Sequence, residues 1–153
     1  MKIVLDKGAK MPTRAHETDA GYDLYATRNF YVPRSDVSVS GYDGAFCGTA
    51  DIGEAIHDTG VHVDIPKGYV GFIKSKSGLN VKHGLTAEGV IDSGYTGSIV
   101  VKLYNHTSES YAFNEGDKIA QLVILPIITP DLELVDSLED TERGDGGFGS
   151  TGR

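Results

Sequence analysis

The chain has 153 residues and a formal net charge of −8, from 22 acidic and 14 basic side chains. The length predicts a single domain, and the negative charge argues against non-specific binding to duplex nucleic acid through a basic surface. Hydrophobic residues make up 39% of the chain and charged residues 24%, which is typical of a globular protein and excludes a wholly disordered one.

Short segments with β-strand alternation follow one another along the chain. In chain order, the predicted strands are residues 2–5, 22–25, 29–32, 61–65, 69–73, 98–104, 110–113, 119–125 and 132–135. No segment keeps apolar residues at helical spacing for three turns, and only residues 80–83 are expected to form one short helical turn. Many short strands joined by Gly, Pro and Asp turns predict an all-β sandwich or barrel.

Two stretches do not fit this strand pattern. Residues 39–56 hold four glycines and scattered acids, which predicts a surface insertion or a long hairpin. From Ser137 onward the chain becomes acidic and then rich in glycine, and five of its last ten residues are glycine. We therefore expect a folded domain over residues 1–136 and a flexible C-terminal arm over residues 137–153.

The single cysteine and the lack of long apolar runs indicate in which cellular compartment the protein is expected. Cys47 has no second cysteine with which to form an intrachain disulfide, which favours a reducing environment. No apolar run approaches the ~18 residues of a membrane span, and no basic-then-apolar leader opens the sequence. These observations predict a cytoplasmic protein that does not enter a membrane.

Two segments in the first half of the chain carry groups suited to a phosphorylated ligand. Asp23, in Ala-Gly-Tyr-Asp-Leu, could lie on the water shell of Mg²⁺, which usually takes one or two carboxylates together with substrate phosphates. Lys76, Ser77 and Gly78 belong to Lys-Ser-Lys-Ser-Gly-Leu-Asn, which could form a nest for an anion just after a strand. Taken alone, each segment is also typical of an ordinary polar turn.

The second half of the chain holds two further segments of this kind. Asp92 and Tyr95 lie in Gly-Val-Ile-Asp-Ser-Gly-Tyr-Thr-Gly, where a carboxylate at a tight turn could orient a water molecule against a bound ligand. Gln121, in Gly-Asp-Lys-Ile-Ala-Gln-Leu, interrupts an apolar strand. It is either a hydrogen-bonded core amide or a ligand contact on a rigid element.

The glycine-rich end of the chain also combines groups that suit a nucleotide. Glycines free backbone N–H groups for an anion, Ser150 and Thr151 add hydroxyl donors, and Arg143 adds a charged fork that matches phosphate. Phe148 offers one aromatic face for a base. The same composition is also typical of a disordered end, so the tail alone does not decide between the two interpretations.

Together, and in this order, these five segments resemble the five motifs of the trimeric dUTPase family, from Pro12 to Gly152. The resemblance implies an all-β, distorted jelly-roll barrel that hydrolyses dUTP to dUMP and pyrophosphate with Mg²⁺ on the triphosphate. It also implies a homotrimer with its sites between subunits. The expected cellular role is to supply dUMP for thymidylate synthesis and to keep uracil out of DNA.

The resemblance also assigns roles residue by residue. It implies that Asp92 activates the attacking water, that Tyr95 packs on the deoxyribose and that Asp23 contacts the metal through water. Lys76, Ser77, Gly78 and Gln121 are expected on the phosphates, and main-chain groups of Gly89 and Ile91 on the uracil. In the tail, Phe148 is expected over the uracil, with Arg143, Gly149, Ser150 and Thr151 closing over the phosphates.

The sequence departs from the family pattern at three places. Lys76 stands where the family most often has Arg, which keeps the charge but removes the bidentate fork. The stretch from His83 to Ile91 is shorter than in many members, and residues 39–56 have no counterpart in the compact family pattern. Insertions near this point are found in phage-type members, so a phage origin and a regulatory protein partner are further hypotheses.

Two alternatives remain open at this point. A dCTP deaminase-like enzyme of the same fold would release ammonia, and the glycine-rich tail argues against it. A nucleotide-sensing module would use dUTP as a switch without needing turnover, and the presence of Asp92 and the tail argues against that as the only function.

Overall fold

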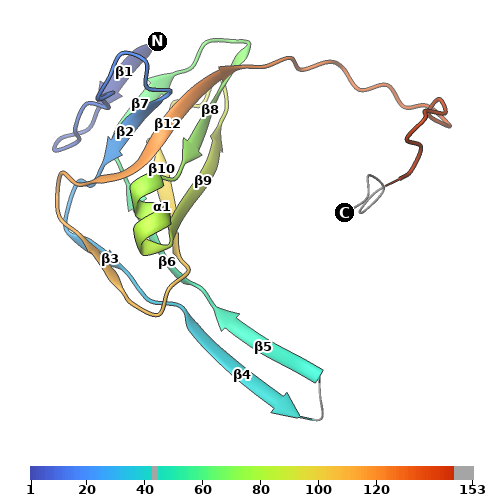
Figure 1. Cartoon of the computed structure of the whole chain (residues 1–153). Helices are drawn as coiled ribbons and strands as arrows, with labels where there is room; N and C mark the ends of the chain where they lie inside the picture. The colour runs from blue at the N-terminus through green and yellow to red at the C-terminus, as the bar shows by residue number, and fades with distance from the viewer. Residues whose placement is uncertain (43–44, 147–153) are drawn as a thin grey trace.

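A curled sheet of six antiparallel strands, in the order β2-β12-β8-β9-β10-β6, forms the centre of the molecule (Figure 1). The structure is a computed structural model and describes residues 1–42 and 45–146. Besides the central sheet there are three two-stranded sheets, which pair β1 with β7, β3 with β11 and β4 with β5. The elements are β1 (Lys2–Leu5), β2 (Gly21–Tyr25), β3 (Phe30–Val32), β4 (Asp36–Tyr42), β5 (Ala45–Asp51), β6 (Gly53–Asp58), β7 (Val61–Asp64), β8 (Tyr69–Lys74), α1 (Ser77–His83), β9 (Leu85–Ile91), β10 (Val100–Asn105), β11 (Tyr111–Phe113) and β12 (Lys118–Pro126). Within the described residues α1 is the one helix, and the predicted all-β fold class is confirmed.

Strand alternation decides which side chains form the core. In β7, Val61 and Val63 are buried, whereas the intervening His62 is only half-buried and faces outward. Leu24, Ile73, Leu103 and Leu122, on four other strands, are each no more than 1% exposed. Full burial of such a side chain contributes about 1.5–3 kcal/mol. The apolar face of the curled sheet is therefore the main source of stability.

Two strands of the central sheet, β6 and β9, were not predicted, and β6 begins within the range predicted as an insertion. β9 reads Leu-Thr-Ala-Glu-Gly-Val-Ile, and its glycine and small residues weaken the strand signal. The strand forms because it lies between β8 and β10 and pairs with both. The predicted helical turn also begins earlier than expected, at Ser77. It ends at His83, and Gly84 caps it with a left-handed φ of 59°. Such a residue is a frequent helix terminator.

The strand predicted over residues 132–135 is wrong. After β12 the chain leaves the body, and residues 127–146 form neither helix nor strand (Figure 1). Leu132 is 98% exposed and Leu134 is 100% exposed. A strand needs a partner for its backbone N–H and C=O groups, and this segment has none within the described part of its own chain.

Residues within the predicted insertion form a hairpin that projects from the body (Figure 1). β4 and β5 pair in continuous register from Asp36 opposite Asp51 to Tyr42 opposite Ala45. At the base of the hairpin, the backbone N–H of Gly53 donates to the hydroxyl of Ser35 at 3.1 Å. β6 then takes residues 53–56 of the predicted range into the central sheet, so the projecting part is shorter than the range 39–56.

The length and hydropathy of the helix decide whether it could cross a membrane. Across the described residues, no helix combines the length and the apolar character needed to cross a bilayer.

Candidate active site

A buried carboxylate between two lysines is the main charged cluster of the molecule. Asp23 on β2 is 5% exposed and forms ion pairs with both Lys76 and Lys118. The Lys118 Nζ lies 2.6 Å from one carboxylate oxygen, and the Lys76 Nζ contacts the other. Asp23 is placed there because β2 pairs with β12, which carries Lys118, while Lys76 precedes α1.

The pKa of Asp23 reflects two opposing effects. Burial is the largest single effect and would raise the pKa of this carboxyl, but the hydrogen bonds and the positive charges of Lys118 and Lys76 together hold the pKa below its ordinary value. The pKa of Lys118 is raised in turn by its hydrogen bond to Asp23. The carboxylate therefore stays ionised at neutral pH, and the two ammonium groups keep a net positive charge beside it.

Gln121 completes this cluster, which we call the lysine cluster (Asp23, Lys76, Lys118 and Gln121). Gln121 pairs across the sheet with both Asp23 and Lys74, and its side-chain amide donates to the carbonyl of Ser75 at 3.0 Å. Gly21 leaves room for this side chain, because a Cβ at that position would force the end of the Gln121 side chain to move. Gln121 is therefore half-buried and fixes the loop that leads to Lys76, rather than lying deep in the core.

Ser77 and Gly78 follow Lys76 in the first turn of α1. Both are exposed, and a Cβ at Gly78 would meet nothing within 4 Å. Ser75 secures this turn to the sheet, since its hydroxyl accepts the N–H of Ala87 at 2.9 Å. The structure thus brings to one region five of the residues for which the sequence predicts contacts with phosphate or metal, namely Asp23, Lys76, Ser77, Gly78 and Gln121.

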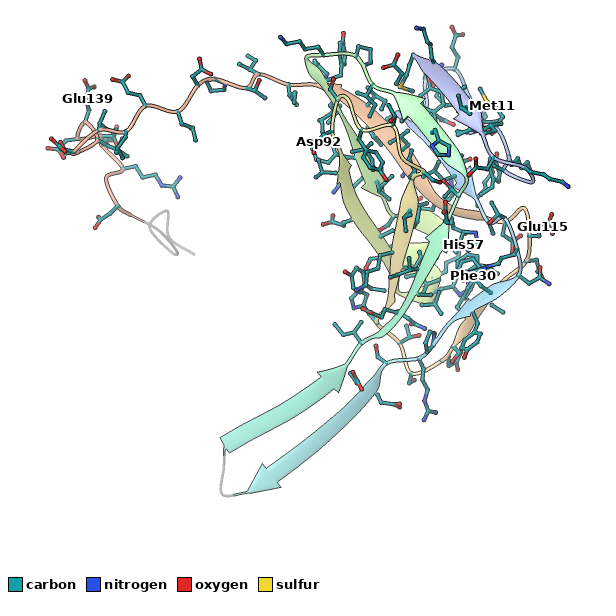
Figure 2. All side chains as sticks on the ribbon, turned by 180° about the vertical axis from the view of Figure 1, so that it is seen from behind. Met11, Phe30, His57, Asp92, Glu115 and Glu139 are labelled. Atoms are coloured by element: carbon teal, nitrogen blue, oxygen red, sulfur yellow. The ribbon has the colours of Figure 1, made fainter. Side chains whose placement is uncertain are left out.

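The second group lies on the loop that follows β9, which we call the Asp92 loop (residues 92–99). Asp92 is exposed at the edge of the body, and its backbone carbonyl accepts the N–H of Tyr95 at 3.1 Å (Figure 2). An open cavity of about 220 Å³ lies against the loop, and its lining residues are Val90, Ile91, Asp92, Tyr95, Ser98 and Val100. Asp92 is therefore an exposed carboxylate that lines a small open cavity together with Tyr95.

Tyr95 is folded back against its own loop. Its hydroxyl donates to the carbonyl of Ser98 at 3.0 Å, and a Cβ on Gly97 would collide with the Tyr95 ring. The glycine at position 97 therefore allows the aromatic ring to lie over the backbone. The ring is still 46% exposed, which leaves a face available for a ligand.

The two groups lie at opposite ends of one strand pair. β8 and β9 are antiparallel, with Gly71 opposite Ile91 and Lys74 opposite Glu88. Asp92 follows the end of β9, whereas Lys76 follows the end of β8, so the residues leave the sheet in opposite directions. The intervening strand from Val70 to Lys74 alone spans roughly 13 Å, at about 3.3 Å per residue.

The C-terminal residues are placed only in part. Arg143 is described, and its Nε–H donates to the carbonyl of Gly146 at 3.0 Å. The segment after β12 that carries it extends away from the body (Figure 1). Phe148, Gly149, Ser150 and Thr151 lie outside the described residues.

Sequence reasoning did not single out two residues of the site. Lys118 forms the second ion pair to Asp23, and Ser75 accepts the N–H of Ala87 and so holds the turn that carries Lys76. Lys118 could have been found from its place in the segment Gly-Asp-Lys-Ile-Ala-Gln-Leu, which also supplies Gln121.

Among residues 1–42 and 45–146, no group of three His, Cys, Asp or Glu side chains is arranged to hold a metal ion. The single carboxylate of Asp23 suits an ion whose other ligands are water and substrate oxygens.

Known proteins resemble this chain over nearly its whole length. The dUTPase family model matches residues 7–152. The deoxyuridine 5'-triphosphate nucleotidohydrolase of Kluyveromyces lactis is 39% identical over 147 residues, which cover 95% of this chain and 88% of the relative.

Solved structures of phage proteins are similar as well. The dUTPase of Staphylococcus bacteriophage 80alpha with dUPNHPP has a TM-score of 0.81 and 33% identity, over 99% of this chain and 98% of that chain. A dUTPase from phage phi11 of S. aureus has a TM-score of 0.72 and 31% identity, over 91% of this chain and 98% of that chain. The phi11 enzyme is described as coordinating a structural Mg(II) ion and as having a species-specific insert.

Proposed function

The chain belongs to the dUTPase family and hydrolyses dUTP, and we propose that it does so with Asp92 as the base and with sites shared between the subunits of a homotrimer. The observation that carries this proposal is the separation of the Asp92 loop from the lysine cluster along β8 and β9. A water activated at Asp92 and the phosphate chain held at Lys76 must meet at one α-phosphorus. A second copy of the chain can bring the two groups together where a single copy keeps them apart.

Asp92 acts on the water that attacks the α-phosphorus. Its exposed carboxylate accepts a proton as the oxygen–phosphorus bond forms, and the bond to the bridging oxygen of the leaving pyrophosphate breaks. The α-phosphate remains with the nucleoside as dUMP. The side chain faces a cavity whose walls include Tyr95, and the Tyr95 ring supplies an apolar surface for the deoxyribose. Main-chain groups of Gly89 and Ile91, on the strand that leads to Asp92, contact the uracil.

The lysine cluster holds the phosphate chain. Lys76 supplies positive charge, Ser77 and Gly78 supply donors in an open turn, and Gln121 fixes the turn through Ser75. A lysine at position 76 contacts phosphate as a point charge, whereas an arginine would form two parallel bonds. Asp23 stays ionised because Lys76 and Lys118 lower its pKa. It can therefore accept hydrogen bonds from the water shell of a cation.

Mg²⁺ fits this arrangement as a substrate-bound ion. Its chemistry is to neutralise the triphosphate charge and to orient the phosphates for in-line attack. Asp23 would hold the ion through water, since both its oxygens already accept hydrogen bonds from lysines. The structural Mg(II) ion described for the phi11 enzyme shows that a relative coordinates this metal.

The C-terminal residues form an arm that completes the site of another subunit. We place the folded domain at residues 1–136 and the arm at residues 137–153. Arg143, Phe148, Gly149, Ser150 and Thr151 close over the uracil and the phosphates and exclude water. Leu132, Leu134 and Leu138 support this assignment, because they are 98%, 100% and 88% exposed and need an apolar partner surface.

A closed trimer is the simplest assembly that uses these parts. The Asp92 loop, the lysine cluster and the arm lie in three separate places on the chain. A cyclic arrangement with head-to-tail contacts gives every subunit the same environment and closes without leaving an open end. Three subunits then give three identical sites.

A product assay tests the proposed reaction. Purified protein with dUTP and Mg²⁺ is expected to release equal amounts of dUMP and pyrophosphate, with at least about tenfold slower release from UTP, dCTP or dTTP. Chelation of the metal by EDTA is expected to stop turnover without changing the circular dichroism spectrum, and added Mg²⁺ to restore it. Ammonia release from dCTP would instead indicate the deaminase reaction, and tight dUTP binding without products would indicate a nucleotide sensor.

The projecting hairpin favours a second function, the binding of a regulatory protein. β4 and β5 extend from the body, and the similar phage 80alpha dUTPase is described as controlling transfer of virulence genes by a G protein-like mechanism. Replacing residues 37–50 by a short glycine loop is expected to leave kcat and KM for dUTP within about twofold, since the hairpin lies away from both groups. A large change in KM would instead place the hairpin over the site.

The cellular role follows from the reaction. Hydrolysis of dUTP supplies dUMP for thymidylate synthesis and keeps uracil out of DNA. We place this activity in the cytoplasm, where nucleotide pools are made and where a lone thiol such as Cys47 stays reduced.

A further inference from the structure

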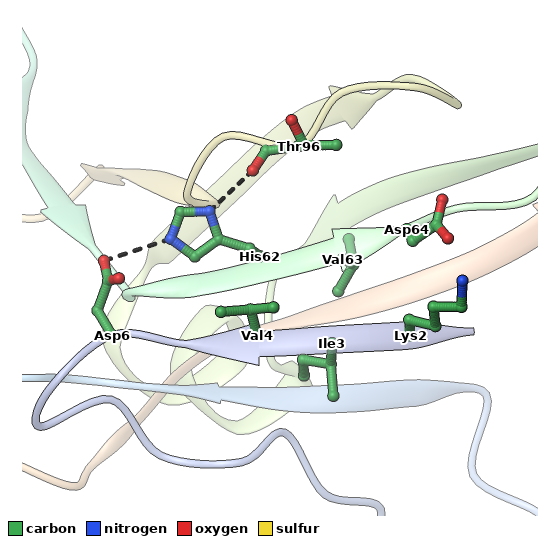
Figure 3. A pocket seen from close by; sticks show the side chains of 8 residues that line it. All are labelled: Lys2, Ile3, Val4, Asp6, His62, Val63, Asp64 and Thr96. Carbon is green, nitrogen blue, oxygen red and sulfur yellow. Dashed lines mark hydrogen bonds and ion pairs between the residues drawn. The ribbon is translucent and has the colours of Figure 1, made fainter.

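His62 joins three parts of the chain that are far apart in sequence. It lies on β7, its Nδ1 is 2.8 Å from the carbonyl oxygen of Thr96, and its Nε2 is 3.3 Å from a carboxylate oxygen of Asp6 (Figure 3). Thr96 is the residue after Tyr95 in the Asp92 loop. Asp6 follows β1, and its backbone N–H donates to the carbonyl of Gly60 at 2.9 Å. The imidazole therefore bridges the N-terminal strand to the loop that carries Asp92.

The ends of the Asp92 loop are held by other bonds. Near its start, the hydroxyl of Ser93 donates to the carbonyl of Ile65 at 3.0 Å. At its end, the N–H of Ile99 donates to the carbonyl of Val61 at 2.8 Å, and the Ser98 hydroxyl donates to Asp58. The bond from His62 acts between these ends, at the residue beside Tyr95. It holds the loop at Thr96, the residue that follows Tyr95.

We propose that His62 is a positioning residue for dUTP hydrolysis, which holds the Asp92 loop through its hydrogen bond to the Thr96 carbonyl and is itself oriented by Asp6. This inference rests on the role proposed for Asp92. A displacement of about 1 Å at a reacting group can cost about 10²-fold in rate. A bond at the centre of the loop can therefore matter to turnover even though His62 does not contact the substrate.

The contacts of His62 favour the imidazolium form. Both ring nitrogens face acceptors, so the doubly protonated ring can donate to Thr96 and to Asp6 together. The hydrogen bond to the Thr96 carbonyl and the hydrogen bond to Asp6 raise the pKa of His62, and the charge of Asp58 acts in the same direction. Lys2 and Asp64 are the other charged residues that line the open cavity around the ring. Because the pKa is raised, the imidazolium and both of its hydrogen bonds persist to higher pH than for an ordinary histidine, and they weaken as the pH rises through the titration of His62.

Steady-state kinetics of two variants test this role. His62→Phe is expected to lower kcat about tenfold with KM changed less than about threefold, because the loop loses its central bond while the lysine cluster is intact. Asp6→Asn is expected to leave kcat near wild type at pH 6 and to move the alkaline decline of kcat to lower pH. His62→Gln, whose amide can donate to Thr96, is expected to recover part of the loss. The melting temperatures should stay within about 2 °C, since His62 is partly exposed.

Matched controls separate this inference from the proposed function. His106→Phe removes another histidine hydrogen bond, the 2.8 Å contact to the Thr86 hydroxyl, and is expected to leave kcat and its pH profile unchanged. Asp92→Asn is assayed beside it. If Asp92→Asn is inactive and His62→Phe has the kcat and pH profile of the wild type, the role of His62 is refuted and that of Asp92 stands. If Asp92→Asn is fully active, the assignment of the base fails, and the inference about His62 fails with it.

Discussion

Replacing Asp92 by Asn is expected to lower kcat for dUTP by about 10²–10⁴-fold, the usual contribution of a general base. The amide has nearly the same shape as the carboxylate but cannot accept the proton of the attacking water. The fold should be unaffected, because Asp92 is exposed and its backbone carbonyl, rather than its side chain, accepts the Tyr95 N–H. The measurement is pyrophosphate release under saturating dUTP, together with a binding assay in which dUTP affinity should stay within about tenfold.

A second aspartate provides the control for this variant. Asp51 is exposed at the base of the projecting hairpin, and Asp51→Asn removes the same charge at a distance from the site. It is expected to have wild-type kinetics. An Asp92→Asn enzyme with kcat within about threefold of wild type would remove Asp92 from the mechanism.

Truncation after Glu142 is expected to leave a folded protein that has lost at least about 10²-fold in kcat/KM, since loss of even one donor to a reacting phosphate or oxyanion has this order of effect. The truncation removes Arg143 and the residues that the family resemblance assigns to the substrate. The barrel should melt at the wild-type temperature, because residues 127–146 form no helix or strand with it. Differential scanning fluorimetry and steady-state kinetics measure the two effects separately.

The control for the truncation keeps the arm and changes one side chain. Asp145→Asn retains the glycines, Arg143 and Phe148, and is expected to have nearly wild-type kinetics. A truncated protein that still hydrolyses dUTP at the normal rate would contradict a role in catalysis for the glycine-rich end and would favour the interpretation as a simple disordered tail.

The fold could be predicted where side-chain alternation is strong. Val61, Val63 and Ile65 predict a half-buried strand, and all three are buried. β9 was missed because Ala87 and Gly89 carry little strand propensity, and its pairing with two neighbours is a property of the whole sheet. The wrong prediction over residues 132–135 has a related cause. Alternating leucines indicate strand potential, but the partner that a strand needs is not encoded in the segment itself.

The roles of the site residues stay predictions that rest on the resemblance of five segments to the family motifs, and the sequence does not indicate the distances between these residues. The contact of Lys118 with Asp23 depends on the register of β12 against β2, which local sequence does not reveal. The contact of His62 with Thr96 likewise joins β7 to a distant loop. The separation of Asp92 from Lys76 required the antiparallel pairing of β8 with β9, and this separation is the reason to expect a shared site.

Mixing two inactive variants tests most directly whether the site is shared between subunits. One is Asp92→Asn, and the other carries Lys76→Ala with Ser77→Ala; each is expected to be nearly inactive alone. Co-expression of equal amounts with separable tags gives mixed trimers that hold two copies of one variant and one copy of the other. In each such cyclic trimer one of the three head-to-tail pairs, and so about one third of the sites, combines an intact Asp92 with an intact lysine cluster from a neighbour. The account predicts that purified mixed trimers recover about this fraction of wild-type kcat, with wild-type KM. Mixed trimers that stay as inactive as the two parents would show that one chain supplies both groups to its own site.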